Sequence, residues 1–250
     1  MIISFFAFII VFSMIVLVHE VGHFIAAKKS GVKVYEFSVG FPFSPRLCTL
    51  FRYKETAFTL RLLPLGGFVS FSKDGDEEAK NLFKASYSRR AFIMSAGSFF
   101  NIIFAFIVFV PIFIIGKHLP FIEALLLSIK TIWGILSGTV IVLSNILSGQ
   151  SGLEELSGPV GIAVIAGQAA SKGFLSLLYF TGVLSMSIGL MNLFPLPALD
   201  GGHLLMLFIE TIRKKPIGLK TYQVINLIGF ALFMILSALV IYKDVVKLVA

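Results

Sequence analysis

The chain has 250 residues, of which 57% are hydrophobic and only 14% are charged, and its mean hydropathy is +0.96. These values exclude an ordinary soluble domain and indicate an integral membrane protein. The net charge of +8 does not point to nucleic acid, because no basic stripe with interleaved aromatic residues stands on a soluble domain. We therefore expect no nucleic-acid partner and interpret the basic residues through the positive-inside rule. One cysteine, Cys48, excludes an intramolecular disulfide.

The first predicted transmembrane helix covers residues 2–27 and is apolar except for a short cluster near its end. It lacks the basic start and small-residue cleavage site of a signal peptide, so we expect it to be retained. At 1.5 Å per residue it can cross a hydrocarbon core of about 30 Å. Lys28 and Lys29 follow at once, which predicts that this end of the helix faces the cytoplasm.

The polar cluster in this helix has the pattern His19-Glu20-Val21-Gly22-His23. Positions i and i+4 lie on one face of a helix, so both imidazoles can bind one Zn²⁺ while Glu20 lies beside a bound water. An ionisable group near a membrane centre costs about 2.5–3.5 kcal/mol on insertion scales, so three on one segment need a partner or a ligand. The cluster therefore predicts a hydrolytic metal site close to the cytoplasmic face of the membrane.

Residues 30–90 are expected to form a cytoplasmic loop, since this segment and its edges carry twelve of the 21 basic residues. Within it, residues 56–63 and 68–71 have strand-like composition, and residues 64–67 are typical of a turn. We expect a small β hairpin or sheet at the membrane surface. One alternative is a plain interfacial loop; the other is an edge strand that pairs with an unfolded substrate segment.

Residues 91–115 are predicted to form the second transmembrane helix, with the polar Asn101 inside its apolar span. Asn101 could form interhelical hydrogen bonds or point toward the metal site. Residues 121–148 are apolar but are interrupted by charged and polar groups. A crossing here would place the later metal ligand on the wrong face, and the segment is too short for two crossings. We expect it to be amphipathic or re-entrant, on the outer face.

Residues 174–194 are predicted to form the third transmembrane helix, and it ends in a segment that contains Pro195 and Pro197. Two prolines at this spacing open the backbone, which is tolerated at membrane depth where it lines a site. Asp200 follows and is a suitable third zinc ligand, leaving a fourth position for water. Basic residues then predict a cytoplasmic loop, and a fourth transmembrane helix at residues 222–241 returns the chain to the outer side. Both termini are thus expected outside.

The sequence resembles the site-two protease family of intramembrane zinc metalloproteases, and its bacterial branch that includes regulator-of-sigma-E proteases. The likeness rests on residues 19–23, 63–69, 156–159 and 192–203, which follow the family's order along nearly the whole chain. The family's Gly-Pro-x-x-Asn motif reads Gly97-Ser98-Phe99-Phe100-Asn101 here. Relatives place PDZ domains between helices two and three, whereas residues 116–120 leave no room for one.

The resemblance implies a single 1–250 protease domain with about four transmembrane helices, one Zn²⁺ per chain and a bacterial inner-membrane location. It implies cleavage of a single-span membrane protein in the bilayer, such as an anti-sigma factor or a signal-peptide remnant. A non-catalytic metal-binding protein or metal transporter is the alternative, and the sequence does not indicate an oligomeric state. The implied site comprises the ligands His19, His23 and Asp200, the general base Glu20, the substrate or oxyanion residues Asn192 and Asn101, and the substrate-binding residues Phe58, Leu60, Gly66, Gly67 and Phe68.

Overall fold

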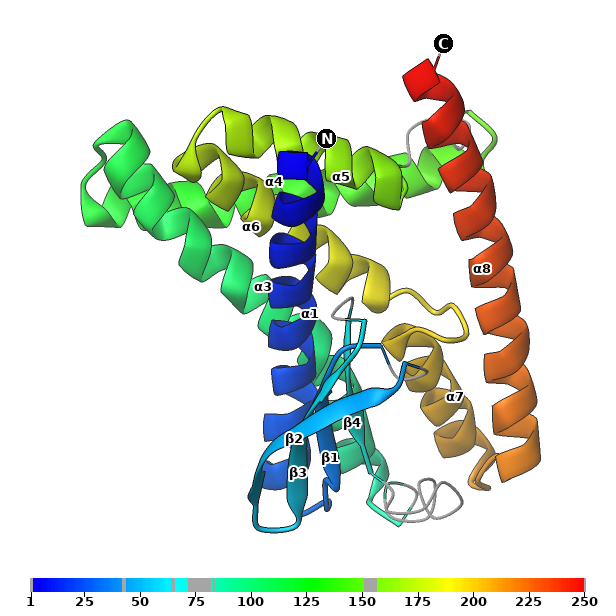
Figure 1. Cartoon of the computed structure of the whole chain (residues 1–250). Helices are drawn as coiled ribbons and strands as arrows, with labels where there is room; N and C mark the ends of the chain where they lie inside the picture. The colour runs from blue at the N-terminus through cyan, green and yellow to red at the C-terminus, as the bar shows by residue number, and fades with distance from the viewer. Residues whose placement is uncertain are drawn as a thin grey trace. The chain divides into compact units, whose positions relative to one another are not determined.

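A computed structural model describes residues 2–41, 44–63, 66–71, 82, 84–150 and 157–249, and these are mostly helical with one small sheet (Figure 1). The mainly helical fold with one small sheet that the sequence predicts is confirmed. The elements in chain order are α1 (Ile2–Lys29), β1 (Glu36–Val39), β2 (Arg46–Tyr53), β3 (Thr56–Arg61), β4 (Gly67–Ser70), α3 (Tyr87–Lys117), α4 (Phe121–Leu147), α5 (Pro159–Ser171), α6 (Phe174–Asn192), α7 (Asp200–Arg213) and α8 (Leu219–Val249).

Among the described residues, five helices are long and apolar enough to cross a membrane, namely α1, α3, α4, α6 and α8. Four of them correspond to the four crossings expected from the sequence. The fifth, α4, covers the segment that we expected to be interfacial or re-entrant, and it is one continuous helix. The length and composition of α4 are therefore compatible both with a membrane crossing and with a position along the membrane surface.

The chain folds into two compact units, each assembled from separate stretches of sequence. The first unit comprises residues 1–11, 102–190 and 230–250, and the second comprises residues 12–101 and 191–229. All predicted site residues belong to the second unit. That unit contains most of α1, the whole sheet, the first half of α3, and α7.

The sheet has four strands in the order β2-β3-β1-β4. Strand β1 pairs in parallel with β3 and antiparallel with β4, while β2 and β3 form an antiparallel hairpin. The small sheet expected from the sequence is present, but residues 56–61 and 67–70 do not form a hairpin with each other, because β1 lies between them. Local composition predicted the positions of β3 and β4 in the sequence. It could not predict that β1, an earlier strand, would pair between them. The predicted turn residues 64 and 65 lie outside the described residues.

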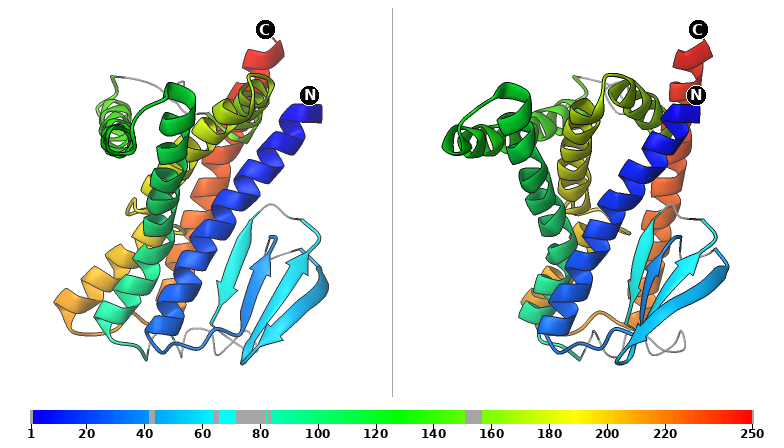
Figure 2. Two further views of the ribbon diagram at one scale, coloured as in Figure 1. Left: turned by 90° about the vertical axis from the view of Figure 1, so that its left-hand side faces the viewer. Right: turned by 60° about the vertical axis from the view of Figure 1, so that its left-hand side comes forward.

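The first unit has its own apolar core, in which α3, α4 and α6 meet. Phe109 is fully buried, and Gly182 of α6 lies against its ring. Helix α4 runs crosswise to the last part of α8 in both Figure 1 and Figure 2. The buried side chain of Asp244 in α8 accepts a hydrogen bond from the Gly161 N–H at 2.8 Å and so caps the first turn of α5.

The helical structure is interrupted between α6 and α7, as expected from Pro195 and Pro197. Leu193 to Leu199 are not helical, and Ala198 has a φ of +73°. The helix that follows, α7, was not expected, since it starts with Asp-Gly-Gly. Both glycines are required by close packing, because a side chain on Gly201 or Gly202 would overlap the carbonyl groups of Leu193, Phe194 and Leu196.

Candidate metal and catalytic site

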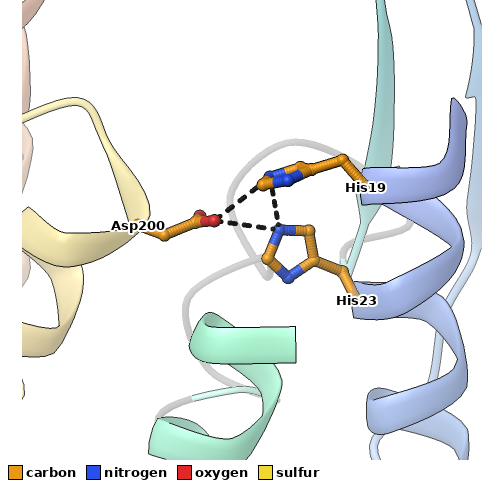
Figure 3. Close-up of side chains that lie close together, drawn as sticks. All are labelled: His19, His23 and Asp200. Carbon is orange, nitrogen blue, oxygen red and sulfur yellow. Dashed lines mark hydrogen bonds and ion pairs between the residues drawn. The ribbon is translucent and has the colours of Figure 1, made fainter. Parts of the chain in front are cut away.

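Helix α1 presents His19 and His23 on one face, one turn apart, and both imidazoles are buried. Their Nε2 atoms lie 3.1 Å apart, and the rings meet edge to face with centroids 4.7 Å apart (Figure 3). Two buried imidazole nitrogen atoms at this separation can supply two of the four ligands of a tetrahedral metal site.

The third member, Asp200, comes from the first turn of α7. Its Oδ2 lies 3.1 Å from Nε2 of His19 and 3.3 Å from Nε2 of His23 (Figure 3). An ionised Asp200 carboxylate at this position would supply the oxygen donor that a metal site of this kind requires.

The three atoms fit a tetrahedral zinc ion. Ligands at about 2.05 Å from zinc in a tetrahedron lie about 3.3 Å from one another, close to the three separations seen here. Three protein ligands also leave the fourth position open, which is the pattern of catalytic rather than structural zinc sites. The fit thus comes from both the spacing and the chemistry of the donors.

The backbone of α3 fixes the imidazole of His23. Its Nδ1–H donates a hydrogen bond to the Ile93 carbonyl at 2.8 Å, which leaves Nε2 free to face the site. Gly97, one turn further along α3, lies directly against both rings: a methyl group there would stand 2.7 Å from Nε2 of His19 and closer still to His23. Sequence reasoning missed these two positions, because the roles of a backbone carbonyl and of an absent side chain depend on how two helices approach.

Glu20 is half-buried and lies between the two histidines and the sheet. A methyl group on Gly67 would stand 3.0 Å from its Cγ, and the backbone of Val69 is in hydrogen-bonding contact with its carboxylate. Strand β4 therefore runs beside the glutamate, and Gly67 provides the room for it. Phe68, which lies between Gly67 and Val69 in the sequence, belongs to the same strand.

The predicted substrate residues fall into three places. Gly66 precedes β4 with a φ of +127°, and Gly67 and Phe68 lie on that edge strand. Asn101 is fully buried on α3, four residues after Gly97 and hence on the same helix face. Asn192 ends α6, eight residues before Asp200.

Strand β3 holds the remaining two, Phe58 and Leu60, and it is internal to the sheet. Its backbone is already paired with β1 on one side and β2 on the other. A substrate strand cannot be added at Phe58 or Leu60, so any main-chain pairing near Glu20 belongs to β4.

Three further hydrogen bonds support α7. Arg90 of α3 donates to the fully buried Glu210 at 2.6 Å, and the second oxygen of Glu210 accepts the Ile217 N–H at 3.1 Å. His203, three residues after Asp200, is bonded to the Tyr222 hydroxyl at 2.5 Å, and burial lowers the pKa of His203, which keeps it neutral. These contacts connect α7 to α3 and to the start of α8.

A histidine pair, a carboxylate and a glutamate beside apolar helices are the residue types expected of a membrane-embedded zinc metallohydrolase. The model of peptidase family M50 matches residues 7–236, and the chain belongs to this family. It is an intramembrane zinc metalloprotease.

Relatives of two kinds resemble the chain. A protein of Clostridium perfringens (strain 13 / Type A), named as a zinc metalloprotease, is 28% identical over 328 residues, covering 95% of this chain and 97% of its own length. The regulator of sigma-W protease RasP of Bacillus subtilis (strain 168) is 45% identical over 106 residues, covering 42% of this chain and 25% of RasP. The zinc metalloprotease RasP of Geobacillus kaustophilus (strain HTA426) is 45% identical over 105 residues, with the same coverage.

The clostridial alignment is longer than this chain. Ninety-five per cent of the chain is about 238 residues, so about 90 of the 328 aligned positions have no counterpart here. That difference is the size of a small domain. In this chain, three residues separate α3 from α4.

Proposed function

We propose that His19, His23 and Asp200 bind one zinc ion per chain and that Glu20 is the general base for peptide hydrolysis. The near-equal separations of 3.1, 3.1 and 3.3 Å among the three donor atoms carry this proposal. The position of Glu20 on the same turn of α1 supports its role, as does the contact of its carboxylate with the backbone of Val69. No other cluster of three potential ligands is found among the described residues.

Zinc at these ligands would polarise the scissile carbonyl and make a bound water acidic enough to lose a proton near neutral pH. Glu20 would accept that proton and deliver it to the leaving amine nitrogen. The Val69 backbone contact would hold the carboxylate in place between these two steps. The Ile93 carbonyl would keep His23 in the tautomer that presents a lone pair at Nε2.

The proposed substrate is a transmembrane segment of a single-span membrane protein. A helical segment hides its carbonyl groups, so it must unwind, and the freed backbone groups need partners inside the membrane. Strand β4 offers them at the free edge of the sheet. The Gly40 N–H donates to the Gly66 carbonyl, and backbone direction alternates along an antiparallel pair, so Gly67 points its N–H and carbonyl away from β1. The Val69 N–H faces the same way and contacts Glu20.

Asn101 and Asn192 are proposed to assist the substrate. Asn101 lies one turn beyond Gly97 on the face of α3 that meets the imidazoles, which suits a donor to the scissile carbonyl or its oxyanion. Asn192 starts the opened segment that leads to Asp200.

We further propose that α1, α3, α6 and α8 cross the membrane and that α4 lies along its outer surface. The crosswise course of α4 relative to the end of α8 supports this (Figure 1). So does its exposed apolar stripe, which recurs at helical spacing through Ile122, Leu126, Ile129, Trp133 and Val140. Both termini would then be outside and the zinc site near the cytoplasmic face of a bacterial inner membrane.

The test is co-expression of tagged single-span proteins, including anti-sigma factors, with this chain or with Glu20→Gln. A fragment cut within the transmembrane segment, formed with the wild-type chain and missing with Glu20→Gln, is the expected result. Equal fragment yields with both chains would contradict the proposal. Metal uptake into proteoliposomes, without cleavage, would favour a transporter instead.

A further inference from the structure

A second site lies on the second unit, between the end of α1 and the β2–β3 hairpin. It is a pocket of about 340 Å³, within the range of small-molecule sites. Its wall is aromatic and its rim carries two ammonium groups. The lining residues are Phe24, Lys28, Phe51, Tyr53, Lys54 and Phe58.

The wall is built by stacked rings. Phe51 stacks on Phe58 with centroids 4.4 Å apart, and Phe24 meets Phe58 edge to face at 5.7 Å. Every residue of β2 is exposed, including Phe51 at 55% and Tyr53 at 59%. Such a surface is unfavourable in water but suits the boundary between hydrocarbon and headgroups, where Tyr and Phe are stable.

The rim lies at the end of the apolar span of α1. Lys28 is in the last turn of the apolar span of α1, and its Nζ stands 5.7 Å from the Phe24 ring. Lys54 lies in the hairpin turn, with Nζ 5.5 Å from the Tyr53 ring. Lys28 also forms an ion pair with the exposed Glu55 at 2.5 Å, and this hydrogen bond holds the pKa of Glu55 below its usual value.

We propose that this pocket binds one anionic phospholipid, with an acyl chain against Phe24, Phe51 and Phe58 and the headgroup phosphate between Lys28 and Lys54. The two cations complement the headgroup, and the rings complement the chain. Glu55 competes with the phosphate for Lys28. Binding would anchor the hairpin, and hence the sheet that carries β4, at a fixed depth in the membrane.

A bound substrate strand is the other conceivable occupant, and the sheet order disfavours it. Strand β1 separates β3 from β4, so the pocket is two strand spacings, about 10 Å, from the edge beside Glu20. A peptide paired with β4 would not reach it. The lipid site is thus independent of the proposed catalytic mechanism.

The experiment measures retention of dioleoylphosphatidylglycerol and dioleoylphosphatidylcholine on the purified full chain by native mass spectrometry. We expect the wild type to prefer phosphatidylglycerol. Each lysine near an anionic lipid contributes about five-fold, so Lys28→Gln with Lys54→Gln should lower the preference about 25-fold. The matched control is Lys29→Gln with Lys33→Gln, two exposed lysines beside the same helix end that do not line the pocket.

Two further sets of variants test the role of Glu55 and the role of the aromatic wall separately. Glu55→Gln removes a competitor and should raise phosphatidylglycerol retention, the opposite sign to loss of the lysines. Phe51→Ser should weaken retention of both lipids relative to Leu47→Ser, a similarly exposed position on β2 outside the pocket. Zinc content is measured throughout to show that each variant is folded.

An equal loss of phosphatidylglycerol preference in Lys28→Gln/Lys54→Gln and in Lys29→Gln/Lys33→Gln would overturn the proposal. Nonspecific attraction between basic residues and anionic lipid would then explain the preference. Complete displacement of the lipid by excess inorganic phosphate would overturn the acyl-chain part. Unchanged lipid retention with altered cleavage in Lys28→Gln/Lys54→Gln would identify a substrate subsite instead.

Discussion

Gly97 of α3 lies so close to His19 of α1 that a single methyl group on its Cα would stand 2.7 Å from the His19 Nε2 atom. Gly22 of α1 is similarly close to α3, since a methyl group there would stand 2.6 Å from the Ala96 carbonyl oxygen. The two helices approach through small residues, as is common between membrane helices. This close approach lets α3 orient the imidazoles with its backbone.

Gly97→Ala should therefore lower zinc affinity while the chain still folds. The added methyl group would displace one or both imidazoles from their positions, and disturbing groups that orient metal ligands typically costs 10–100-fold in affinity. The measurement is a zinc titration of the purified protein. Gly138→Ala is the matched control, because that helical glycine of α4 has open space around it. Equal affinities in the two variants would show that Gly97 does not define the site.

Asp200→Ala should reduce bound zinc well below that of the wild type, because two imidazoles alone hold the ion weakly. Metal analysis after gel filtration measures the stoichiometry. Asp244→Ala is the control: it removes the aspartate of α8 that caps the first turn of α5, costing about 0.5–2 kcal/mol of stability, but should leave zinc content unchanged. Unchanged zinc content in Asp200→Ala would remove Asp200 from the ligand set.

The long apolar helices could be predicted because their composition is a local property of the sequence. Helix α7 could not, since Gly201 and Gly202 disfavour a helix and are explained only by the carbonyl groups packed against them. The insertion of β1 between β3 and β4 is likewise a long-range pairing. Four-residue strands with little alternation do not encode their neighbours.

Part of the candidate site was also accessible from sequence. His19, Glu20 and His23 follow from helical spacing, and Asp200 follows from the broken helix. The structure brings these ligand side chains together, while their binding of zinc stays a prediction. The hydrogen bond from His23 to the Ile93 carbonyl and the close approach of Gly97 to both imidazoles could not be predicted from local sequence. Both depend on how the backbone of α3 packs against α1.

The edge of β4 provides a test of substrate pairing. Gly67→Pro removes an N–H that points away from β1, whereas Gly67→Ala keeps that N–H and adds the same crowding beside Glu20. Loss of hydrogen bonds worth about 1–1.5 kcal/mol should slow cleavage about ten-fold in the proline variant. Cleavage rates are measured with zinc content as the folding control. Equal rates in the two variants would argue against strand addition at β4.

The ion pair of Arg90 and Glu210 should matter for stability more than for chemistry. Glu210→Ala removes the carboxylate that faces the buried Arg90 guanidinium, and breaking a buried ion pair in this way typically costs about 3–5 kcal/mol. The double variant Arg90→Met/Glu210→Met removes both charges and should lose less. Thermal unfolding in detergent compares them. A double variant less stable than Glu210→Ala would contradict this account of the pair.

The most direct test of the catalytic site uses purified wild type and Glu20→Gln side by side, with zinc content and cleavage of a reconstituted single-span substrate measured on the same samples. The predicted result is equal zinc, about one per chain, with cleavage lost in Glu20→Gln because its amide cannot accept the proton. Cleavage at the wild-type rate by zinc-loaded Glu20→Gln would contradict the assignment of Glu20 as general base.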